Sequence, residues 1–498
     1  MTASAADKFA DPRNAKAFRF VACDFDAASG TASLSYAFDD GPLLTERIVF
    51  PDAPALSDER KAAFAQALRL LHLIAGVSYY KAGIPGELRV ETGALDADTA
   101  EFLHELYFHG LAEFAYQNKL DLGERLASLL PSGEGARRAD EGKASQQTSA
   151  VASGKALPSS APSGHPRSEA LRGQALLPAG EGKKLNLPRR TLLPIGGGKD
   201  SLVSVELCKS INEPATAVWI GDSALIAACA ERTGLPLLNI KRRIAPELFE
   251  YNRQGAWNGH VPVTAINSAI LVCAAILYGF DAIAFSNERS ASSATLEYLG
   301  RQINHQWSKS LDFERLLREQ IHAHVAADLD YFSLLRPWAE LAVAREFAKH
   351  SQYDAVFSSC NRNFRILGEH PSDRWCGQCP KCHFVFLALA PFVAKPRLLR
   401  IFGRNLLDDI ALVPGFDALL EYRDHKPFEC VGEGSESRAA MYALTQRAEW
   451  REDALVARFA KEILPQLDRA ALAFAPLLAP AGEHFLPARF ASLLNAPR

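Results

Sequence analysis

The sequence predicts an α/β protein: a parallel doubly wound sheet with a small α+β domain before it and a helical cap after it. From Arg190 onward, short apolar runs alternate with segments of helical periodicity. A glycine-rich turn joins the first of these runs to the first helix. The tail from Asp453 to Asn495 has only helical periodicity. Strands that alternate with helices favour a parallel sheet with right-handed crossovers and helices on both faces.

Composition divides the chain into four segments. We predict an α+β domain over 1–128, a linker over 129–189, the α/β domain over 190–400, and a loop and helical region over 401–498. The first segment has expected strands at 18–21, 32–38, 47–50 and 88–91, and helices from Ser57 and over 98–118. The linker is rich in Ser, Ala, Gly and Pro, so it lacks the apolar surface that would offset the entropy of ordering, and we expect disorder.

The α/β domain has five expected strands and four expected helices. The strands are 191–195, 215–220, 235–240, 282–285 and 355–358, and the helices are 202–210, 224–233, 263–277 and 341–350. Ligands bind at the carboxyl ends of such strands. The polar groups expected to converge there are Gly196–Ser201, Gly221-Asp222, Asn287–Arg289 and Cys360–Arg362.

The loop at the end of the first strand is typical of a phosphate site. Three glycines, Gly196, Gly197 and Gly198, precede Lys199, Asp200 and Ser201 and then an apolar helix. Glycines let the backbone approach an anion, and a helix N-terminus attracts one. Asp200 fits beside a phosphate only if a cation such as Mg²⁺ lies between them. The alternative is an ordinary glycine turn without a nucleotide.

A second motif gathers thiols. Cys376, Cys379 and Cys382 form a C-x-x-C-x-x-C run, and Cys360 lies sixteen residues before it. Four thiolates suit tetrahedral Zn²⁺, and the same run also suits part of an iron–sulfur site. Buried free thiols are the remaining interpretation.

The other cysteines differ in their surroundings. Four lie in apolar runs and are expected in the core: Cys23, Cys208, Cys229 and Cys273. Cys430 lies in a loop with Glu429 and Glu433 and is a candidate general base, or an incidental thiol.

Charge and hydropathy limit the location and the partners. The net charge of −3 over 498 residues gives no bulk attraction to nucleic acid. The N-terminus has no apolar signal segment, and the apolar stretch from Ala265 to Leu277 is too short to cross a bilayer. We therefore expect a cytoplasmic protein with reduced thiols and no membrane or nucleic-acid partner.

Taken together, these motifs resemble a known family. GGGKDS is similar to the SGGxDS loop of the PP-loop ATP pyrophosphatases (adenine nucleotide alpha hydrolase-like fold), with Gly196 in place of serine. The combination over roughly 190–450 resembles the UDP-N-acetyl-α-D-muramoyl-L-alanyl-L-glutamate epimerase family. It comprises this loop, Ser-Asn-Glu-Arg at 286–289, Ser-Cys-Asn-Arg at 359–362, WCGQCPKCHFVF at 375–386 and KPFECVGEGSE at 426–436.

The resemblance implies an isomerase of peptidoglycan precursor synthesis. It would invert the terminal L-Glu of UDP-MurNAc-L-Ala-L-Glu, and ATP with Mg²⁺ would be consumed to AMP and pyrophosphate. A Mur ligase that adds L-Glu would be its functional partner, and Zn²⁺ is the further metal expected.

Site roles are hypotheses under this resemblance. The loop Gly196–Ser201, with Asp222 and Glu288, would bind ATP and Mg²⁺. Arg289, Arg362 and Arg365 would hold the γ-carboxylate or the diphosphate of the substrate. The catalytic candidates are Asp200, Cys430 and Glu433.

Two other functions remain open. A PP-loop enzyme with a Cys₄ site could modify a nucleobase or a tRNA, as the 7-cyano-7-deazaguanine synthases do. A nucleotide-sensing protein without turnover is the non-enzymatic alternative, and Gly196 in place of serine is its support.

Overall fold

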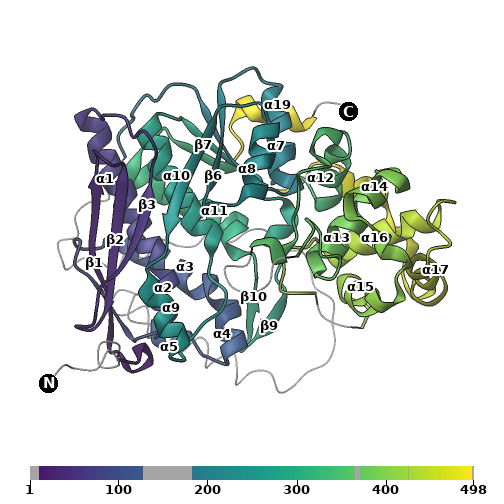
Figure 1. Cartoon of the computed structure of the whole chain (residues 1–498), viewed down its shortest axis with the longest axis horizontal. Coiled ribbons are helices and arrows are strands. Elements are labelled where there is room, and N and C mark those ends of the chain that lie inside the picture. The colour runs from purple at the N-terminus through teal and green to yellow at the C-terminus, as the bar shows by residue number, and fades with distance from the viewer. Residues whose placement is uncertain (1–9, 127–181, 365–370, 424–425, 496–498) are drawn as a thin grey trace, which may run out of the picture.

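A nine-stranded sheet runs through the described part of the protein, beside a separate two-stranded sheet of β9 (Leu296–Tyr298) and β10 (Arg301–Ile303). The structure, a computed structural model, describes residues 10–126, 182–364, 371–423 and 426–495. The strand order is β11-β8-β5-β6-β7-β3-β2-β1-β4. Figure 1 shows the N-terminal strands at one side of the molecule and the C-terminal helices at the other. The molecule is therefore a mixed α/β protein whose large sheet is mainly parallel.

Five parallel strands form one half of the sheet. They are β5 (Thr191–Pro194), β6 (Ala215–Ile220), β7 (Leu237–Arg243), β8 (Ala282–Phe285) and β11 (Asp330–Ser333). Four of these strands were expected from the sequence. The expected strand at 355–358 is wrong, because the chain turns there and the Ser358 amide bonds to the Gly197 carbonyl at 2.9 Å. Instead, β11 pairs with β8 and supplies the edge strand.

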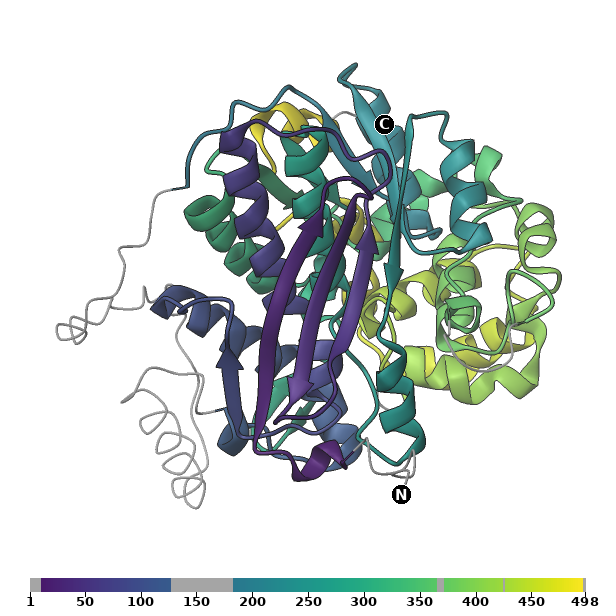
Figure 2. The same cartoon turned by 60° about the vertical axis from the view of Figure 1, so that its left-hand side comes forward.

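The N-terminal segment continues the same sheet. Its strands are β1 (Ala17–Asp26), β2 (Thr31–Phe38), β3 (Leu44–Val49) and β4 (Glu87–Val90). β3 pairs antiparallel with β7, and Figure 2 shows these strands side by side. Glu46 and Arg242 form an ion pair of 2.6 Å across this junction, with the Glu46 side chain fully buried. Segments far apart in the sequence thus share one hydrogen-bonded layer.

Helices cover the sheet. They are α1 (Asp58–Ala75), α2 (Val77–Tyr80), α3 (Ala97–Gly110), α4 (Ala112–Asn118), α5 (Gly123–Leu126), α7 (Lys199–Lys209), α8 (Ala224–Arg232), α9 (Pro246–Arg253), α10 (Val263–Tyr278), α11 (Leu311–Gln320) and α12 (Glu340–Phe347). The single helix expected over 98–118 is broken at Leu111 into α3 and α4. Arg60 of α1 donates to the Leu277 carbonyl of α10 at 2.9 Å, which joins these two helices.

Among the described residues, one stretch, Asp58–Tyr80, is long and apolar enough to span a bilayer. Its apolar window is 78% buried inside the molecule, and its N-cap, Ser57, accepts a bond from the Arg60 amide. This stretch is α1 with α2, and both helices pack in the core.

The C-terminal segment is helical and packs on a second hydrophobic core. Its helices are α13 (Pro380–Leu389), α14 (Lys395–Phe402), α15 (Val413–Leu419), α16 (Gly434–Thr445), α17 (Ala454–Arg458), α18 (Phe474–Leu478) and α19 (Ala488–Asn495). Most of the linker predicted over 129–189 lies outside the described residues. Its described end is attached to the core, since the amides of Leu185 and Asn186 donate to Asp328 at 2.9 and 2.8 Å.

Candidate active site

The glycine loop connects β5 to α7, with Gly196 exposed, Gly198 half-buried and Gly197 buried. Gly197 has φ of +79°, a conformation that favours glycine. A Cβ on Gly198 would lie 2.7 Å from the Ser359 hydroxyl, whereas a Cβ on Gly196 would meet no atom within 4 Å. The Gly196 amide donates to the Ser201 hydroxyl at 3.3 Å. The loop therefore has open space at Gly196, close to the N-terminus of α7, which suits an anion.

Lys199 turns inward from this loop. Its side chain is 1% exposed and pairs with Asp200 and with Glu340 at the start of α12. Burial alone would raise the pKa of Asp200, but the Lys199 charge outweighs it and the pKa is lowered. Burial raises the pKa of Glu340 to about 7 despite Lys199. The Lys199 ammonium thus lies between two carboxylates. It keeps Asp200 ionised, whereas the pKa of Glu340 stays near neutral pH.

Two further buried glutamates lie near these groups. Glu288 follows β8 and accepts bonds from the Ala291 amide at 3.0 Å and the Ser290 hydroxyl at 2.8 Å. Burial, reinforced by Glu340 and Glu288, raises the pKa of Glu436 to about 8. Glu340 was not anticipated from the sequence, whereas Glu436 ends the KPFECVGEGSE run at 426–436. Together these side chains form an acidic cluster at the strand ends.

Cys430 is surrounded by cations. The Lys309 ammonium lies 3.1 Å from its sulfur, and Lys381 donates to its carbonyl. Burial would raise the pKa of the Cys430 thiol, but Lys309 and His305 lower it to about 5. The pKa of His305 rises to about 9, because its bonds to Cys430 and Glu113 outweigh burial. At neutral pH the pair is therefore a thiolate and an imidazolium.

The N-terminal segment supplies the carboxylate behind His305. Glu113 of α4 accepts a bond from His305 Nδ1, and its side chain is 8% exposed. Gln117 donates to the other Glu113 oxygen at 3.0 Å. His260 Nδ1 lies 3.6 Å from Glu113, and burial lowers the pKa of His260 to about 4. His260 is therefore neutral beside a charged neighbour.

The glycine loop and Cys430 share one electrostatic environment. Lys309, which lies against Cys430, also interacts with Asp200 and Glu288. Lys381, which holds the Cys430 carbonyl, interacts with Asp200 as well. Two parts of the chain separated by more than two hundred residues therefore meet at the carboxyl end of the parallel strands.

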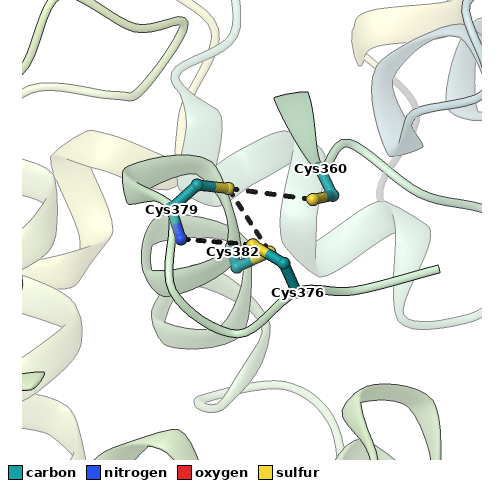
Figure 3. Close-up of side chains that lie close together, drawn as sticks. All are labelled: Cys360, Cys376, Cys379 and Cys382. Carbon is teal, nitrogen blue, oxygen red and sulfur yellow. Dashed lines mark hydrogen bonds between the residues drawn. The ribbon is translucent and has the colours of Figure 1, made fainter. Parts of the chain in front are cut away.

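The four predicted metal ligands lie together, as Figure 3 shows. The sulfur–sulfur distances are 3.5 Å for Cys379–Cys382, 3.7 Å for Cys376–Cys382 and 3.9 Å for Cys360–Cys379. Tetrahedral Zn²⁺ with bonds of about 2.3 Å would place its sulfurs about 3.8 Å apart. An iron–sulfur cluster, with each thiolate on its own iron, needs a wider spacing. The thiols fit a single metal ion.

The remaining predicted residues have varied surroundings. Asp222 is exposed, and its pKa is lowered by bonds to Lys241, at 2.6 Å, and Arg243. Glu433 caps α16 and accepts from the Ser293 hydroxyl at 2.7 Å. Arg289 follows Glu288 and is half-buried, and Arg362 is exposed. The prediction for Arg365 lies outside the described residues.

Comparison with known proteins identifies the family. The chain matches the MurL N-terminal domain over residues 9–156 and 165–334, and the MurL C-terminal domain over 356–473. It is 53% identical to the UDP-N-acetyl-alpha-D-muramoyl-L-alanyl-L-glutamate epimerase of Xanthomonas oryzae pv. oryzae over 96% of both chains. The chain belongs to this epimerase family. It is accordingly an enzyme of the isomerase class.

Two more distant relatives carry the same name. The Salinispora tropica epimerase is 40% identical over 97% of this chain and 96% of its own length. The Micromonospora sp. epimerase is 39% identical over 97% of this chain and 98% of its own. The similarity spans nearly the whole chain, so the family includes both the N-terminal strands and the C-terminal helices.

Four residues around the thiol were not anticipated from the sequence: Glu113, His260, His305 and Lys309. They lie on α4 and in segments before α10 and α11, and none belongs to a compact motif. The one signal in the sequence is that His and Glu side chains can act as acids, bases or hydrogen-bond partners. Many His and Glu residues have no functional role, so this signal is weak. Only the folded chain brings His305 and Lys309 to Cys430, with Glu113 and His260 beside His305.

Proposed function

We propose that this protein epimerises the terminal L-Glu of UDP-MurNAc-L-Ala-L-Glu to D-Glu and consumes ATP to AMP and pyrophosphate. The observation that carries the proposal is the placement of the Cys430 thiolate and the glycine loop around one group of buried charges. Family membership gives the reaction class. The same arguments favour a PP-loop fold for the parallel half of the sheet.

The chemistry explains why an epimerase would use ATP. An α-proton next to an ionised carboxylate is hard to remove, because the product would carry two negative charges on adjacent atoms. Adenylation of that carboxylate removes its charge and makes the α-proton acidic. A base can then take the proton, a proton returns to the opposite face, and water releases the free acid.

Each candidate residue has a role in this scheme. The amides of Gly196, Gly197 and Gly198 and the hydroxyl of Ser201 would hold the pyrophosphate of ATP. Asp200 would bind the Mg²⁺ that accompanies it, since its lowered pKa keeps it ionised. Glu288 and Asp222 are the further ATP contacts proposed.

The substrate side would use cations and a base. Arg289, Arg362 and Arg365 would hold the γ-carboxylate or the diphosphate. The Cys430 thiolate or a nearby glutamate, such as Glu433, would receive the α-proton.

Zn²⁺ would have a structural role in this scheme. Cys360, Cys376, Cys379 and Cys382 would hold it, and a set of four thiolates leaves no open position for a substrate. Lys381 lies between two of these ligands in the sequence, so the metal would fix the residue that binds the Cys430 carbonyl.

The proposed cellular context follows from the substrate. A ligase that joins L-Glu to UDP-MurNAc-L-Ala must act first, and both reactions belong to cytoplasmic precursor synthesis. Nucleic acid and membrane have no place in the reaction.

The decisive experiment measures chirality. The enzyme is incubated with UDP-MurNAc-L-Ala-L-Glu, ATP and Mg²⁺, and the product is hydrolysed and its glutamate resolved on a chiral column. We expect D-Glu to appear only when ATP is present. Glutamate that stays wholly L would contradict the proposal.

A variant of the loop tests the role of ATP. Asp200→Ala should abolish the release of pyrophosphate that depends on substrate, because Mg²⁺ loses its carboxylate. Asp222→Ala, which alters an exposed ion pair, is the matched comparison and should show a smaller loss. Undiminished release in Asp200→Ala would remove Asp200 from the mechanism.

A further inference from the structure

Cys430 stands at the end of a line of side chains from three distant segments. Glu113 lies on α4, His305 follows β10 (Arg301–Ile303), and Cys430 precedes α16. Glu113 occupies Nδ1 of His305, so Nε2 is the ring nitrogen left for the thiol. Gln117 holds the second Glu113 oxygen at 3.0 Å, which fixes the carboxylate. A thiol, an imidazole and a carboxylate in this order are the parts of an activated nucleophile.

The thiol also lies close to the loop proposed to bind ATP. The Lys309 ammonium is 3.1 Å from the Cys430 sulfur, and both Lys309 and Lys381 interact with Asp200. An acyl group activated at the loop would therefore be formed among the same cations that surround the thiol. These cations would also stabilise the oxyanion of a tetrahedral intermediate.

We propose that Cys430 takes the acyl group from the adenylate and forms a thioester with the substrate, and that His305 and Glu113 are its positioning residues. This proposal rests on the proposed ATP-dependent epimerase function. The sulfur lone pair forms the carbon–sulfur bond, and the bond from the carbonyl carbon to the phosphate oxygen breaks. Its electron pair leaves with AMP. Water later cleaves the thioester, which returns the carboxylate and the thiolate and releases two protons.

Charge at the site favours the nucleophilic role of Cys430 over the role of proton acceptor. The groups that face the sulfur are Lys309, Lys381 and His305, with Glu429 beside it and Asp200 beyond the lysines. A thiol whose pKa falls from 9.0 to about 5 binds a proton about 10⁴-fold more weakly. Attack on an adenylate needs no proton transfer, because AMP leaves as an anion.

A carboxylate beside the thioester is then available for the α-proton. Glu429 precedes Cys430, and the Asn361 side-chain amide donates to it. The carbonyl of a thioester acidifies the neighbouring carbon–hydrogen bond more than an ionised carboxylate does. Acylation and proton removal would thus fall to two adjacent residues.

A single-turnover experiment tests the thioester. Excess enzyme is mixed with ATP, Mg²⁺ and UDP-MurNAc-L-Ala-L-Glu that carries ¹⁴C in its glutamate, and samples are quenched in acid over time. We expect label to precipitate with the protein, to map to the Cys430 peptide and to be released by neutral hydroxylamine. Product formation with label that stays soluble at every time point would overturn the thioester.

A variant separates this inference from the proposed function. Cys430→Ala should keep the exchange of pyrophosphate into ATP, accumulate soluble acyl-adenylate and form no D-Glu. Cys23→Ala, at a half-buried thiol on β1, is the control and should behave as wild type. D-Glu formation by Cys430→Ala would overturn the thioester alone. Wild-type enzyme without substrate-dependent exchange would overturn the proposed function itself.

The positioning roles are tested without substrate. The rate of alkylation of Cys430 by iodoacetamide, followed by peptide mass spectrometry against pH, should have a midpoint near pH 5. Glu113→Gln and His305→Gln should raise the midpoint by at least about one pH unit, because they weaken or remove the cation beside sulfur. Glu105→Gln, which alters a different Glu–His pair on α3, should leave it unchanged. An unchanged midpoint in both site variants would overturn the positioning roles.

Discussion

The two cysteine sites of this protein use the same side chain in opposite ways. Cys360, Cys376, Cys379 and Cys382 face one another at 3.5–3.9 Å, and each sulfur has other sulfurs as its neighbours. Cys430 has no such partner among the described residues and instead faces an ammonium and an imidazolium. The first arrangement suits a shared metal ion and the second a single reactive thiolate. The neighbours of a thiol, rather than the thiol itself, decide its chemistry.

The two sites are also joined. Lys381 lies within the C-x-x-C-x-x-C motif, and its ammonium donates to the Cys430 carbonyl. The four-cysteine cluster thus holds one wall of the site around Cys430. Variants of the four-cysteine cluster should mainly change stability, whereas variants of Cys430 should mainly change activity.

The largest expected effect comes from the reactive thiol. Cys430→Ala should lower the rate of D-Glu formation by about 10³-fold or more, because it removes the activated group from the site. Its zinc content should stay close to that of wild type, and its melting temperature should fall by only a few degrees, because the charged thiolate also contributes to stability at neutral pH. Chiral analysis, metal analysis and a thermal melt on the same sample measure the three quantities. A variant that melts much earlier would show that Cys430 is structural.

The second expected effect comes from the proposed metal ligands. With the proposed Zn²⁺ bound to the wild type, Cys379→Ser should lose the metal and lower the free energy of unfolding by about 4 kcal/mol or more, because buried thiolates lose their common cation. Metal analysis and urea unfolding measure this change. Cys376→Ser, at the half-buried ligand, is a matched variant with the same direction. Full activity in a metal-free Cys379→Ser would show that the metal site does not support Cys430.

The third prediction concerns pH. The folded pKa of Cys430, about 5, lies below its usual 9.0, so its contribution to stability is fully present above pH 9 and is lost as pH falls toward 5. The folded pKa of His305, about 9, lies above its usual 6.5, so its contribution is fully present below pH 6.5 and is lost as pH rises toward 9. The combined contribution of the two residues to the free energy of unfolding therefore rises from pH 5 to 6.5. It is then nearly constant from pH 6.5 to 9, because the gain from Cys430 offsets the loss from His305.

Unfolding of wild type and Cys430→Ala at several pH values checks this sum. Wild type should gain about 1–2 kcal/mol relative to the variant between pH 5 and 6.5. Parallel curves over that interval would show that Cys430 carries no charge in the folded protein.

The smallest expected effect comes from a cysteine that belongs to neither site. Cys273 is fully buried on α10, and burial raises its pKa above the usual range. Cys273→Ala should cost about 1 kcal/mol of stability through lost packing and should leave metal content and activity unchanged. A melt and an activity assay measure this. A large loss of activity would mean that a change in the packing of α10 alters the geometry of the active site.

Much of this arrangement could be predicted from local sequence. The strands β5, β6, β7 and β8 were expected from apolar runs, and the structure confirms them. The C-x-x-C-x-x-C motif was also local, and Cys360 is the one member of the four-cysteine cluster that lies outside it. The strand expected at 355–358 failed, because Val356 and Phe357 are apolar for a different reason: they pack against the C-terminal core in a turn.

The sequence by itself determined the glycine loop, the C-x-x-C-x-x-C run and the alternation of strands and helices. Each depends on residues close together in the chain, so spacing alone defines it. Only the tertiary structure decided that Lys199 faces inward, that the N-terminal strands extend the central sheet, and that Glu113 and His305 meet Cys430. Those outcomes depend on how distant segments pack together and on the interactions between their buried charges. The spacing of residues along the chain does not specify which buried charges become neighbours.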